Sequence, residues 1–508
     1  MKKGSTLVKS TFIIMIVSLI SRVLGFVRDM LIAKNFGAGM YTDAYNIAVS
    51  VPEILFTLVG LAISTAFLPT LSKIKAKNGN EEMYGFANNV INILFVISFL
   101  FFIGTIIFSR QIVNIFDFSE ETKLLAVRLL NITLLNLLFL SVNACFTALL
   151  QVNEDFVIPS ILGLFFNLPM ILYLVLFKNY DIVGLTIANV IGNFFRVAVQ
   201  VPSLVKHGYK YKLIANFRDE RLKVIVILIL PVIVGAGANS LNMVVDTKIA
   251  SSLPNGSVSA LNYAQKLIIF INTIIVTSVT SVVYPVMANM RSNYDESGFI
   301  NILKKSILYL AILLIPITAA IMIFSEEVVS VVYARGEFTQ YAVHITTLSL
   351  LGYGLGIFFT GIRDVLNSTL FSMGKTKITT VNGVIGVIIN VVLSITLSRY
   401  IGIIGIALAS SIAMLVTSML LLRSIIKLEK IFRIKDMIKK ISLVILNSLI
   451  MGAVLYILGA NLNGKLQPMV ILIIGAIVGG IIYFVLCYMF KVEEIVEIKN
   501  AIMKKIRR

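Results

Sequence analysis

The chain has 508 residues, of which 58% are hydrophobic and only 14% are charged, and its mean hydropathy is +0.96. A soluble chain of this length cannot bury so much apolar surface, so a polytopic membrane protein is predicted. The formal net charge of +19 does not indicate nucleic-acid binding, because the basic residues lie in short loops between apolar segments. Cys145 and Cys487 lie in separate apolar segments, which favours neither a disulfide nor a metal site.

Fourteen apolar segments are long enough to cross a bilayer as helices, so the predicted fold class is an all-α polytopic membrane protein. Lys and Arg are concentrated in the two tails and in the even-numbered loops, so both termini are expected to be cytoplasmic. In chain order the segments are 8–34, 45–71, 87–108, 124–150, 157–177, 182–204, 224–247, 260–290, 302–324, 341–371, 378–397, 401–422, 441–459 and 469–490.

Four short matches recur in order at a nearly constant spacing, which indicates an internal repeat of six helices. The longest pairs 184–206 with 405–427 without a gap. An even number of helices gives both copies the same membrane orientation, so two pseudo-symmetric lobes with a site between them are predicted. The expected domains are an N-lobe (1–206), an interfacial amphipathic linker (207–223), a C-lobe (224–428), and two C-terminal helices with a basic tail (429–508).

Charged residues inside these segments point to a transport path, because a charge at membrane depth is costly and usually lines a polar cavity. In the first segment, Arg22 and Asp29 are seven residues apart and share a helix face, with Arg28 about 100° away. The first two helices of each repeat also carry Asp43, Glu53, Asp246 and Lys266.

Arginine's planar fork suits phosphate oxygens, so a cationic chamber for an anionic, phosphate-bearing headgroup is predicted. The alternative is that these charges pair with one another, as Arg28 would with Asp29 or Asp43, and only lock helices together. Arg363 and Asp364 fit a gate or a structural pair better than a ligand site. Arg128 fits snorkelling to the interface, and Arg196 is assigned to neither role.

No P-loop, paired-cysteine metal site or nucleophile elbow occurs in the sequence, so a transporter is expected and not an enzyme. The alternatives of another class are a polyprenyl-phosphate glycosyltransferase, which would show large loops with catalytic acids, and a non-transporting scaffold. For the scaffold, neutralising the charges of the chamber would be harmless.

Six runs of residues form a set of motifs along the chain: Ser21 to Asp29, Thr42-Asp43-Ala44-Tyr45, Ala66-Phe67-Leu68-Pro69, Gly256 to Lys266, Tyr333 to Thr339 and Gly402 to Ser410. These runs resemble the MurJ (MviN) family of lipid II flippases, within the multidrug/oligosaccharidyl-lipid/polysaccharide exporter superfamily. The resemblance spans essentially the whole chain, and that family has two six-helix lobes and two extra helices.

The resemblance implies a peptidoglycan-biosynthesis protein of the bacterial cytoplasmic membrane. It would move an undecaprenyl-pyrophosphate-linked precursor, lipid II, from the inner to the outer leaflet by alternating access. The residues that match the family's substrate site are Arg22, Arg28, Asp29, Asp43 and Lys266. No cofactor is implied except a coupling sodium ion, for which Asp246 matches the family's acid.

The sequence also departs from the family pattern. Lys266 stands where an arginine is usual, and Pro52-Glu53 is not followed by the usual arginine of the second segment. Flipping of another polyprenyl-linked oligosaccharide is therefore the first alternative. A drug/cation antiporter is a weaker one, because it would favour an acidic, aromatic cavity. The glycan, the coupling ion and the oligomeric state stay open at this point.

Overall fold

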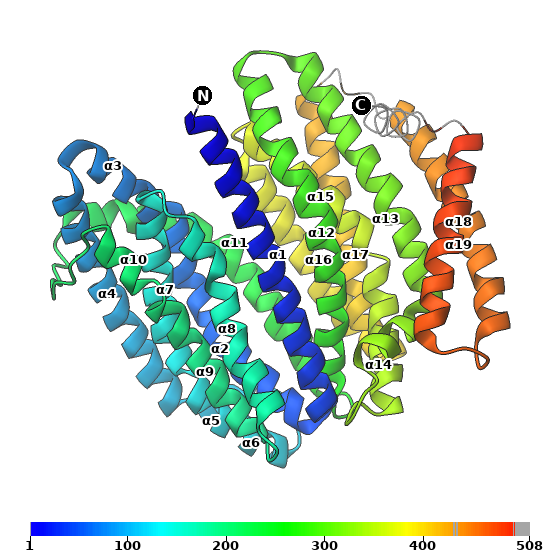
Figure 1. The fold of residues 1–508 in the computed structure, drawn as a ribbon, viewed down its shortest axis with the longest axis horizontal. Coiled ribbons are helices and arrows are strands. Elements are labelled where there is room, and N and C mark those ends of the chain that lie inside the picture. Colours follow the sequence, from blue (N-terminus) through cyan, green and yellow to red (C-terminus); the bar gives the residue numbers. More distant parts are fainter. Residues whose placement is uncertain (1, 430–431, 433–434, 491, 493–508) are drawn as a thin grey trace. The chain divides into compact units, whose positions relative to one another are not determined.

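The structure is a computed structural model that describes residues 2–429, 432, 435–490 and 492, and the expected basic tail lies outside the described residues. Over the described ranges the regular secondary structure is helical throughout (Figure 1). The elements are α1 (Lys2–Phe36), α2 (Met40–Ala62), the π-helical turn η1 (Ile63–Phe67), α3 (Leu68–Asn78), α4 (Asn80–Ile107), α5 (Ser109–Val113), α6 (Glu120–Thr133), α7 (Leu135–Val152), α8 (Val157–Leu176), α9 (Ile182–Ala198), α10 (Val201–Lys206), α11 (Glu220–Ser251), α12 (Ser257–Ser292), α13 (Glu296–Tyr333), α14 (Gln340–Gly354), α15 (Ile357–Ser372), α16 (Thr376–Ile401), α17 (Ile403–Leu428), α18 (Lys435–Leu462) and α19 (Pro468–Met489).

The prediction of an all-α membrane protein is confirmed, and every predicted segment coincides with a helix or with a broken run of helices. Four segments are broken, at the junctions α2–η1–α3, α6–α7, α9–α10 and α14–α15. Among the described residues, ten helices are long and apolar enough to span a membrane, or eleven if the pair α14 and α15, bent by 44°, is one span. The count of fourteen crossings stays a prediction.

The chain folds into two compact units. The first holds residues 1–259 with the short segment Gly336–Phe338, and the second holds the rest. Helix α11 packs on α2 and η1 and so belongs to the first unit, although the repeat assigned it to the C-lobe. The two-lobe division derived from the repeat stays a prediction.

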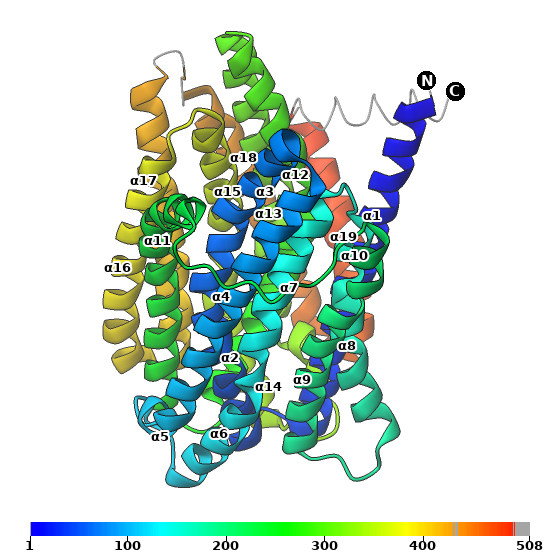
Figure 2. The same cartoon turned by 90° about the vertical axis from the view of Figure 1, so that its left-hand side faces the viewer.

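Within the first unit, α8 packs between α1 and α9, and glycines bring these helices close (Figure 2). A Cβ atom on Gly192 of α9 would lie 2.4 Å from the carbonyl oxygen of Phe166 in α8. A Cβ atom on Gly163 of α8 would lie 3.2 Å from that of Ser21 in α1. Small residues at such crossings let helix backbones approach closely in a membrane, so they set the position of the side chains on α8.

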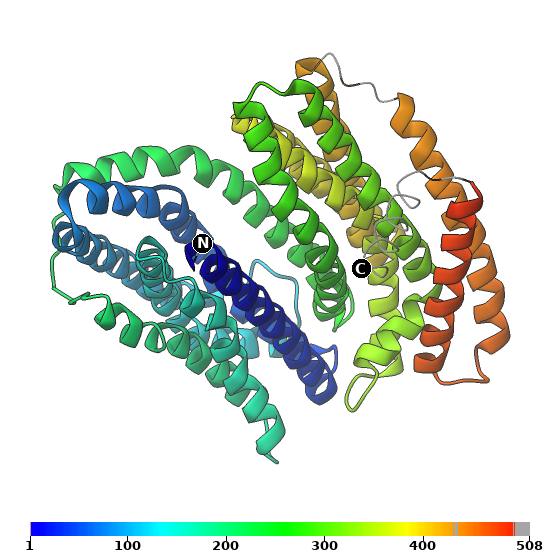
Figure 3. The same ribbon diagram turned by 45° about the horizontal axis from the view of Figure 1, so that its top comes forward.

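Within the second unit, α13 carries the two C-terminal helices, which lie beside it in Figure 3. Phe324 interrupts α13 with non-helical angles (φ −104°, ψ 26°), and its ring fills the space beside Gly459 of α18 and Gly475 of α19. The Tyr483 hydroxyl donates a hydrogen bond of 2.9 Å to the carbonyl oxygen of Ile312. This packing fixes α18 and α19 to one face of α13.

The linker between α10 and α11, residues 207–219, contains no helix and crosses the first unit (Figure 2). Asn88, Asn89 and Asn92 of α4 donate side-chain hydrogen bonds of 2.9–3.1 Å to its main-chain carbonyls at Lys210, Lys212, Ile214 and Asn216. Irregular backbone is tolerated near a membrane only where its polar groups are satisfied. The row of asparagines supplies those partners.

Both ends of this linker are also held by side chains. Tyr84 of α4 donates a hydrogen bond of 2.7 Å to the carbonyl oxygen of His207. At the other end Asp219 caps α11, and hydrogen bonds from Arg221 hold the pKa of the Asp219 carboxyl below its ordinary value. Leu213 is 84% exposed and lies among exposed lysines, which suits the predicted interfacial position of the linker.

Asn89→Ala is expected to loosen the linker, because Asn89 both donates to the carbonyl of Asn216 and accepts from its N–H group at 2.6 Å. Each bond contributes about 1 kcal/mol, so trypsin cleavage between Lys210 and Arg218 should rise roughly tenfold or more. Limited proteolysis of the purified protein measures this rate. Asn80→Ala, at the exposed start of α4, is the control, and equal rates for the two variants would contradict the role of Asn89.

Candidate functional site

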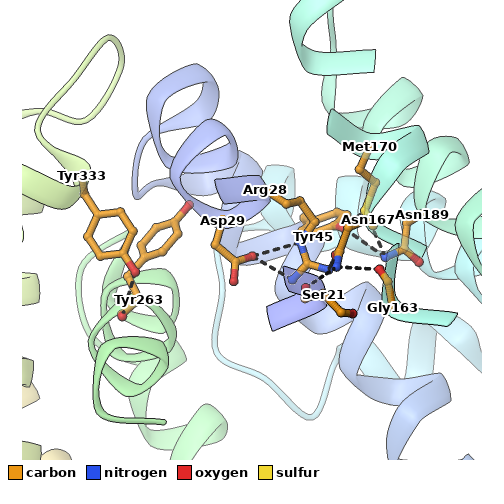
Figure 4. Close-up of polar contacts among 10 residues, drawn as sticks. All are labelled: Ser21, Arg28, Asp29, Tyr45, Gly163, Asn167, Met170, Asn189, Tyr263 and Tyr333. Atoms are coloured by element: carbon orange, nitrogen blue, oxygen red, sulfur yellow. Dashed lines mark hydrogen bonds and ion pairs between the residues drawn. The ribbon is translucent and has the colours of Figure 1, made fainter. Parts of the chain in front are cut away.

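The charged run of α1 contacts α8 through Arg28 (Figure 4). The Nε and Nη2 atoms of Arg28 donate to Oδ1 of Asp29 at 3.1 and 2.9 Å, and its Nη1 donates to Oδ1 of Asn167 at 2.9 Å. Asp29 is 6% exposed and Arg28 is half-buried. The structure therefore brings together the two sequence-predicted residues and adds an amide from α8 that the sequence analysis did not select.

Asn167 is itself held in place by main-chain oxygens. Its Nδ2 atom donates to the carbonyl oxygen of Gly163 at 2.8 Å and to that of Ser21 at 3.4 Å, so its Oδ1 atom points to Arg28 (Figure 4). A single asparagine within an apolar helix is a signal of function in a membrane protein. That signal was present in the sequence of α8 and identifies Asn167.

Arg28 retains donors for a ligand. A guanidinium group has five N–H groups, and the bonds to Asp29 and Asn167 use three of them. The remaining two, one on each terminal nitrogen, can donate to oxygens of a phosphate or carboxylate. Asp29 and Asn167 fix the direction of these N–H groups before any ligand arrives.

Arg22 lies six residues earlier on α1, and its side chain is exposed. Within the described residues it forms no ion pair. Its exposure and its separation from the Arg28 cluster leave it available to an anion that approaches along α1.

Asp43 of α2 has a different environment from the arginines. It is 1% exposed, and its carboxylate accepts hydrogen bonds from the N–H groups of Gly256 at 2.6 Å and Ser259 at 2.8 Å, and from the Ser259 hydroxyl at 2.6 Å. Gly256 directly precedes α12 and Ser259 lies in its first turn, and both belong to the first unit. The first N–H groups of a helix have no partner within that helix, and the Asp43 carboxylate accepts hydrogen bonds from those at the start of α12.

Lys266 lies in the second unit, half-buried on α12, where its ammonium group is 5.8 Å from the ring centroid of Tyr263. Tyr263 packs against Tyr333 of α13 with ring centroids 4.9 Å apart, and the Tyr333 hydroxyl donates to the carbonyl oxygen of Tyr263 at 3.2 Å (Figure 4). Two buried tyrosines therefore support the turn of α12 that carries Lys266.

Asp246 of α11, the residue matched to a sodium site, is half-buried and accepts a hydrogen bond of 3.3 Å from Asn242. Across the part of the chain that the structure describes, no group of three His, Cys, Asp or Glu residues could hold a metal ion. In the second unit, Asn390 of α16 donates to the Ser410 hydroxyl at 2.9 Å. Oxygen atoms are the ligands that hard cations such as Na⁺ prefer.

Arg363 and Asp364 form an ion pair of 2.8 Å between neighbouring residues of α15. The remaining contact of Arg363 is a 2.9 Å approach of Nη1 to the sulfur of Met414 in α17. This arrangement links α15 to α17, and the role of the two residues as a gate or a structural pair stays a prediction.

Sequence reasoning left Arg196 unassigned, and the structure places it on α9 beside the Arg28 cluster. Its guanidinium carbon lies 3.9 Å from the ring centroid of Phe166, and that of Arg28 lies 5.4 Å from the same centroid.

Nearby, a buried chain of hydrogen-bonded side chains connects α9 to its neighbours. Asn189 donates to the Tyr45 hydroxyl at 3.3 Å and accepts from Asn136 at 2.8 Å.

Comparison with known proteins identifies the family. The profile of the family "Lipid II flippase MurJ" matches residues 32–477. The chain belongs to the MurJ family of lipid II flippases. The family resemblance predicted from the sequence is confirmed, and with it the expectation of a transporter and not an enzyme.

Relatives in the MurJ family match over most of the chain. The lipid II flippase MurJ of Thermosipho africanus is 30% identical over 451 residues, covering 88% of this chain and 90% of its own. The probable lipid II flippase MurJ of Buchnera aphidicola subsp. Schizaphis graminum is 30% identical over 419 residues, covering 80% and 81%. A solved structure of a lipid II flippase MurJ in an inward closed conformation aligns with a TM-score of 0.81 at 28% identity, covering 94% of this chain and 99% of its own.

More distant solved structures share the fold alone. An inward-facing multidrug resistance transporter of the MATE family, in the MOP superfamily, aligns with a TM-score of 0.64 at 15% identity and covers 81% of this chain. MurJ family members and drug transporters thus use one helical architecture, and the residues of the site must separate their substrates.

Proposed function

We propose that this protein is a lipid II flippase of the bacterial cytoplasmic membrane. It moves the undecaprenyl-pyrophosphate-linked peptidoglycan precursor from the inner to the outer leaflet by alternating access between two lobes. The observation that carries the proposal is the family match over residues 32–477. The membrane-embedded arginine of α1, with two N–H groups directed by Asp29 and Asn167, supports an anionic headgroup as the cargo.

In this proposal Arg28 binds pyrophosphate oxygens through its oriented N–H groups, and Arg22 and Lys266 add positive charge. Asp29 holds Arg28 in position. Asp43 acts through the start of α12, because its carboxylate accepts three hydrogen bonds from Gly256 and Ser259. Arg363 and Asp364 link α15 to α17 and do not contact the substrate.

The membrane potential supplies part of the driving force. An inside-negative potential favours outward movement of negative charge by about 2.3 kcal/mol per charge per 100 mV. Two phosphate charges would therefore gain roughly 4–5 kcal/mol on crossing. A sodium ion bound by Asp246 would add a second coupling route. The concentration of Lys and Arg in the tails and even-numbered loops supports a cytoplasmic position for both termini.

A reconstituted flipping assay tests the proposal. Purified protein in liposomes is given fluorescent lipid II, a polyprenyl-linked oligosaccharide of unrelated glycan sequence, or a cationic dye, each in a separate sample. We expect transport of lipid II, faster with an inside-negative potential, and none of the dye. If only the lipid with the unrelated glycan is transported, lipid II is not the substrate. Transport of neither lipid would refute the proposal.

A further inference from the structure

Arg196 is a membrane-embedded cation without a carboxylate partner. It lies on α9, half-buried, and within the described residues no Asp or Glu comes within ion-pair distance of it. Its guanidinium group donates one hydrogen bond, from Nη1 to Oδ1 of Asn193 at 3.1 Å. Since a guanidinium group has five N–H groups, four remain for other partners. A charged side chain within an apolar span usually lines a polar cavity or a transport path, which makes Arg196 a candidate for contact with a ligand.

The position of Arg196 is built by its surroundings. Asn193 is buried and anchored by a hydrogen bond of 3.4 Å from its Nδ2 atom to the carbonyl oxygen of Asn189. The ring of Phe166 supports the guanidinium group from α8, and Gly192 brings α9 against the backbone of Phe166. These contacts hold the Arg196 head in one place, as a binding residue requires.

Arg196 and Arg28 share the ring of Phe166, so two cations from α9 and α1 lie against one phenyl group. The two guanidinium groups repel each other, and Glu53 attracts both from a distance. Asp29 pairs with Arg28 at 2.9 Å. The attraction of Glu53 acts on both arginines at longer range and opposes their mutual repulsion, so the two arginines offer a ligand their unused N–H groups and not an uncompensated charge.

One anion can engage both arginines. Six N–H groups stay unused on the two side chains, two on Arg28 and four on Arg196, and they come from α1 and α9, which both pack on α8. A single phosphate would satisfy one arginine. Two linked phosphates offer enough oxygens to satisfy both arginines at once.

We propose that Arg196 and Arg28 form a two-arginine clamp that selects a pyrophosphate-linked lipid over a monophosphate-linked one, with Phe166 as the spacer between them. The proposal rests on the proposed function and deepens it, because it assigns a second binding residue and a headgroup preference to the same site. Arg28 takes one phosphate and Arg196 the other, so Arg196 determines specificity.

Binding of undecaprenyl pyrophosphate and undecaprenyl monophosphate to the full-length protein in lipid nanodiscs tests the clamp. We expect Arg196→Gln to weaken binding of the pyrophosphate about tenfold or more and to change binding of the monophosphate less than about threefold. Arg196→Lys keeps the charge but loses the fork, so an intermediate loss is expected. Arg128→Gln is the control, since Arg128 is an exposed arginine on α6 outside the cluster.

The outcomes separate the two proposals. If the unmodified protein binds the pyrophosphate and Arg196→Gln binds both lipids as the unmodified protein does, or loses both equally, the clamp is refuted and the flippase function stands. If the unmodified protein neither binds the pyrophosphate nor flips lipid II, both proposals fail. If Arg196→Gln does not fold, Arg196→Lys decides. An unchanged preference of Arg196→Lys for the pyrophosphate lipid over the monophosphate lipid refutes the clamp, and a selective loss of pyrophosphate binding supports it.

Discussion

Arg28→Ala is expected to lower the rate of lipid II flipping by roughly 100-fold or more. The substitution removes two oriented N–H groups, and a hydrogen bond to a charged partner contributes about 1.5–3 kcal/mol. The initial rate of flipping in liposomes, normalised to inserted protein, measures the effect. Arg128→Ala serves as the matched control, because Arg128 is exposed on α6 and outside the cluster.

Loss of Arg28 also strands a buried acid, so activity alone does not separate binding from folding. Asp29 is 6% exposed and pairs with Arg28 at 2.9 Å. Removing one partner of a buried pair costs about 3–5 kcal/mol. The double variant Arg28→Ala/Asp29→Asn removes the stranded charge and should recover most of the thermal stability that the single variant loses.

The double variant decides the role of Arg28. If it is stable and still inactive, Arg28 acts on the substrate. Recovery of flipping together with stability would show that Arg28 and Asp29 only hold α1 in place, which is the ion-pairing alternative raised by the sequence.

Asp43→Ala is expected to destabilise the protein by about 2–4 kcal/mol, because it leaves two N–H groups and one hydroxyl of the α12 start without their acceptor. Asp43→Asn keeps one side-chain oxygen as an acceptor, so its loss of stability should be about half that of Asp43→Ala. Thermal unfolding in detergent, followed by a fluorescence-based assay, measures both values.

Ser259→Ala removes one of the three hydrogen bonds to Asp43 and the bond of 3.1 Å that the Ser259 hydroxyl accepts from Asn46, and it is the control for this series. We expect the order of stability to follow the number of bonds lost. A stable Asp43→Ala variant that no longer flips lipid II would reverse the assignment and place Asp43 in contact with the substrate.

The sequence predicted the helices and the charged run of α1 because both depend on local patterns. Apolar stretches of sufficient length and an arginine within one of them are visible without a structure. The breaks at η1 and between α14 and α15 were missed, since apolar composition continues through them. The predicted span boundaries differ from the helix ends for the same reason.

The partners of the charges could not be predicted, because they lie far along the chain. Arg28 contacts Asn167, which is 139 residues away, and Asp43 contacts Ser259, which is 216 residues away. One sequence shows that both acids and arginines are present but not which helices bring them together. Asp43 therefore entered the list of site residues, whereas Phe166 and Arg196 did not.

The asparagine row on α4 and the linker that it binds are expected to tolerate substitutions to different degrees. Its bonds to Lys210 and Lys212 reach only main-chain carbonyls, so these two exposed side chains can be replaced or can carry a fluorophore, whereas Tyr211 donates its hydroxyl to Asn92 and is fixed. Proline is excluded at 216, since the N–H group of Asn216 is needed. The helix, by contrast, accepts no substitute at Asn89, because only an amide both donates and accepts at that length.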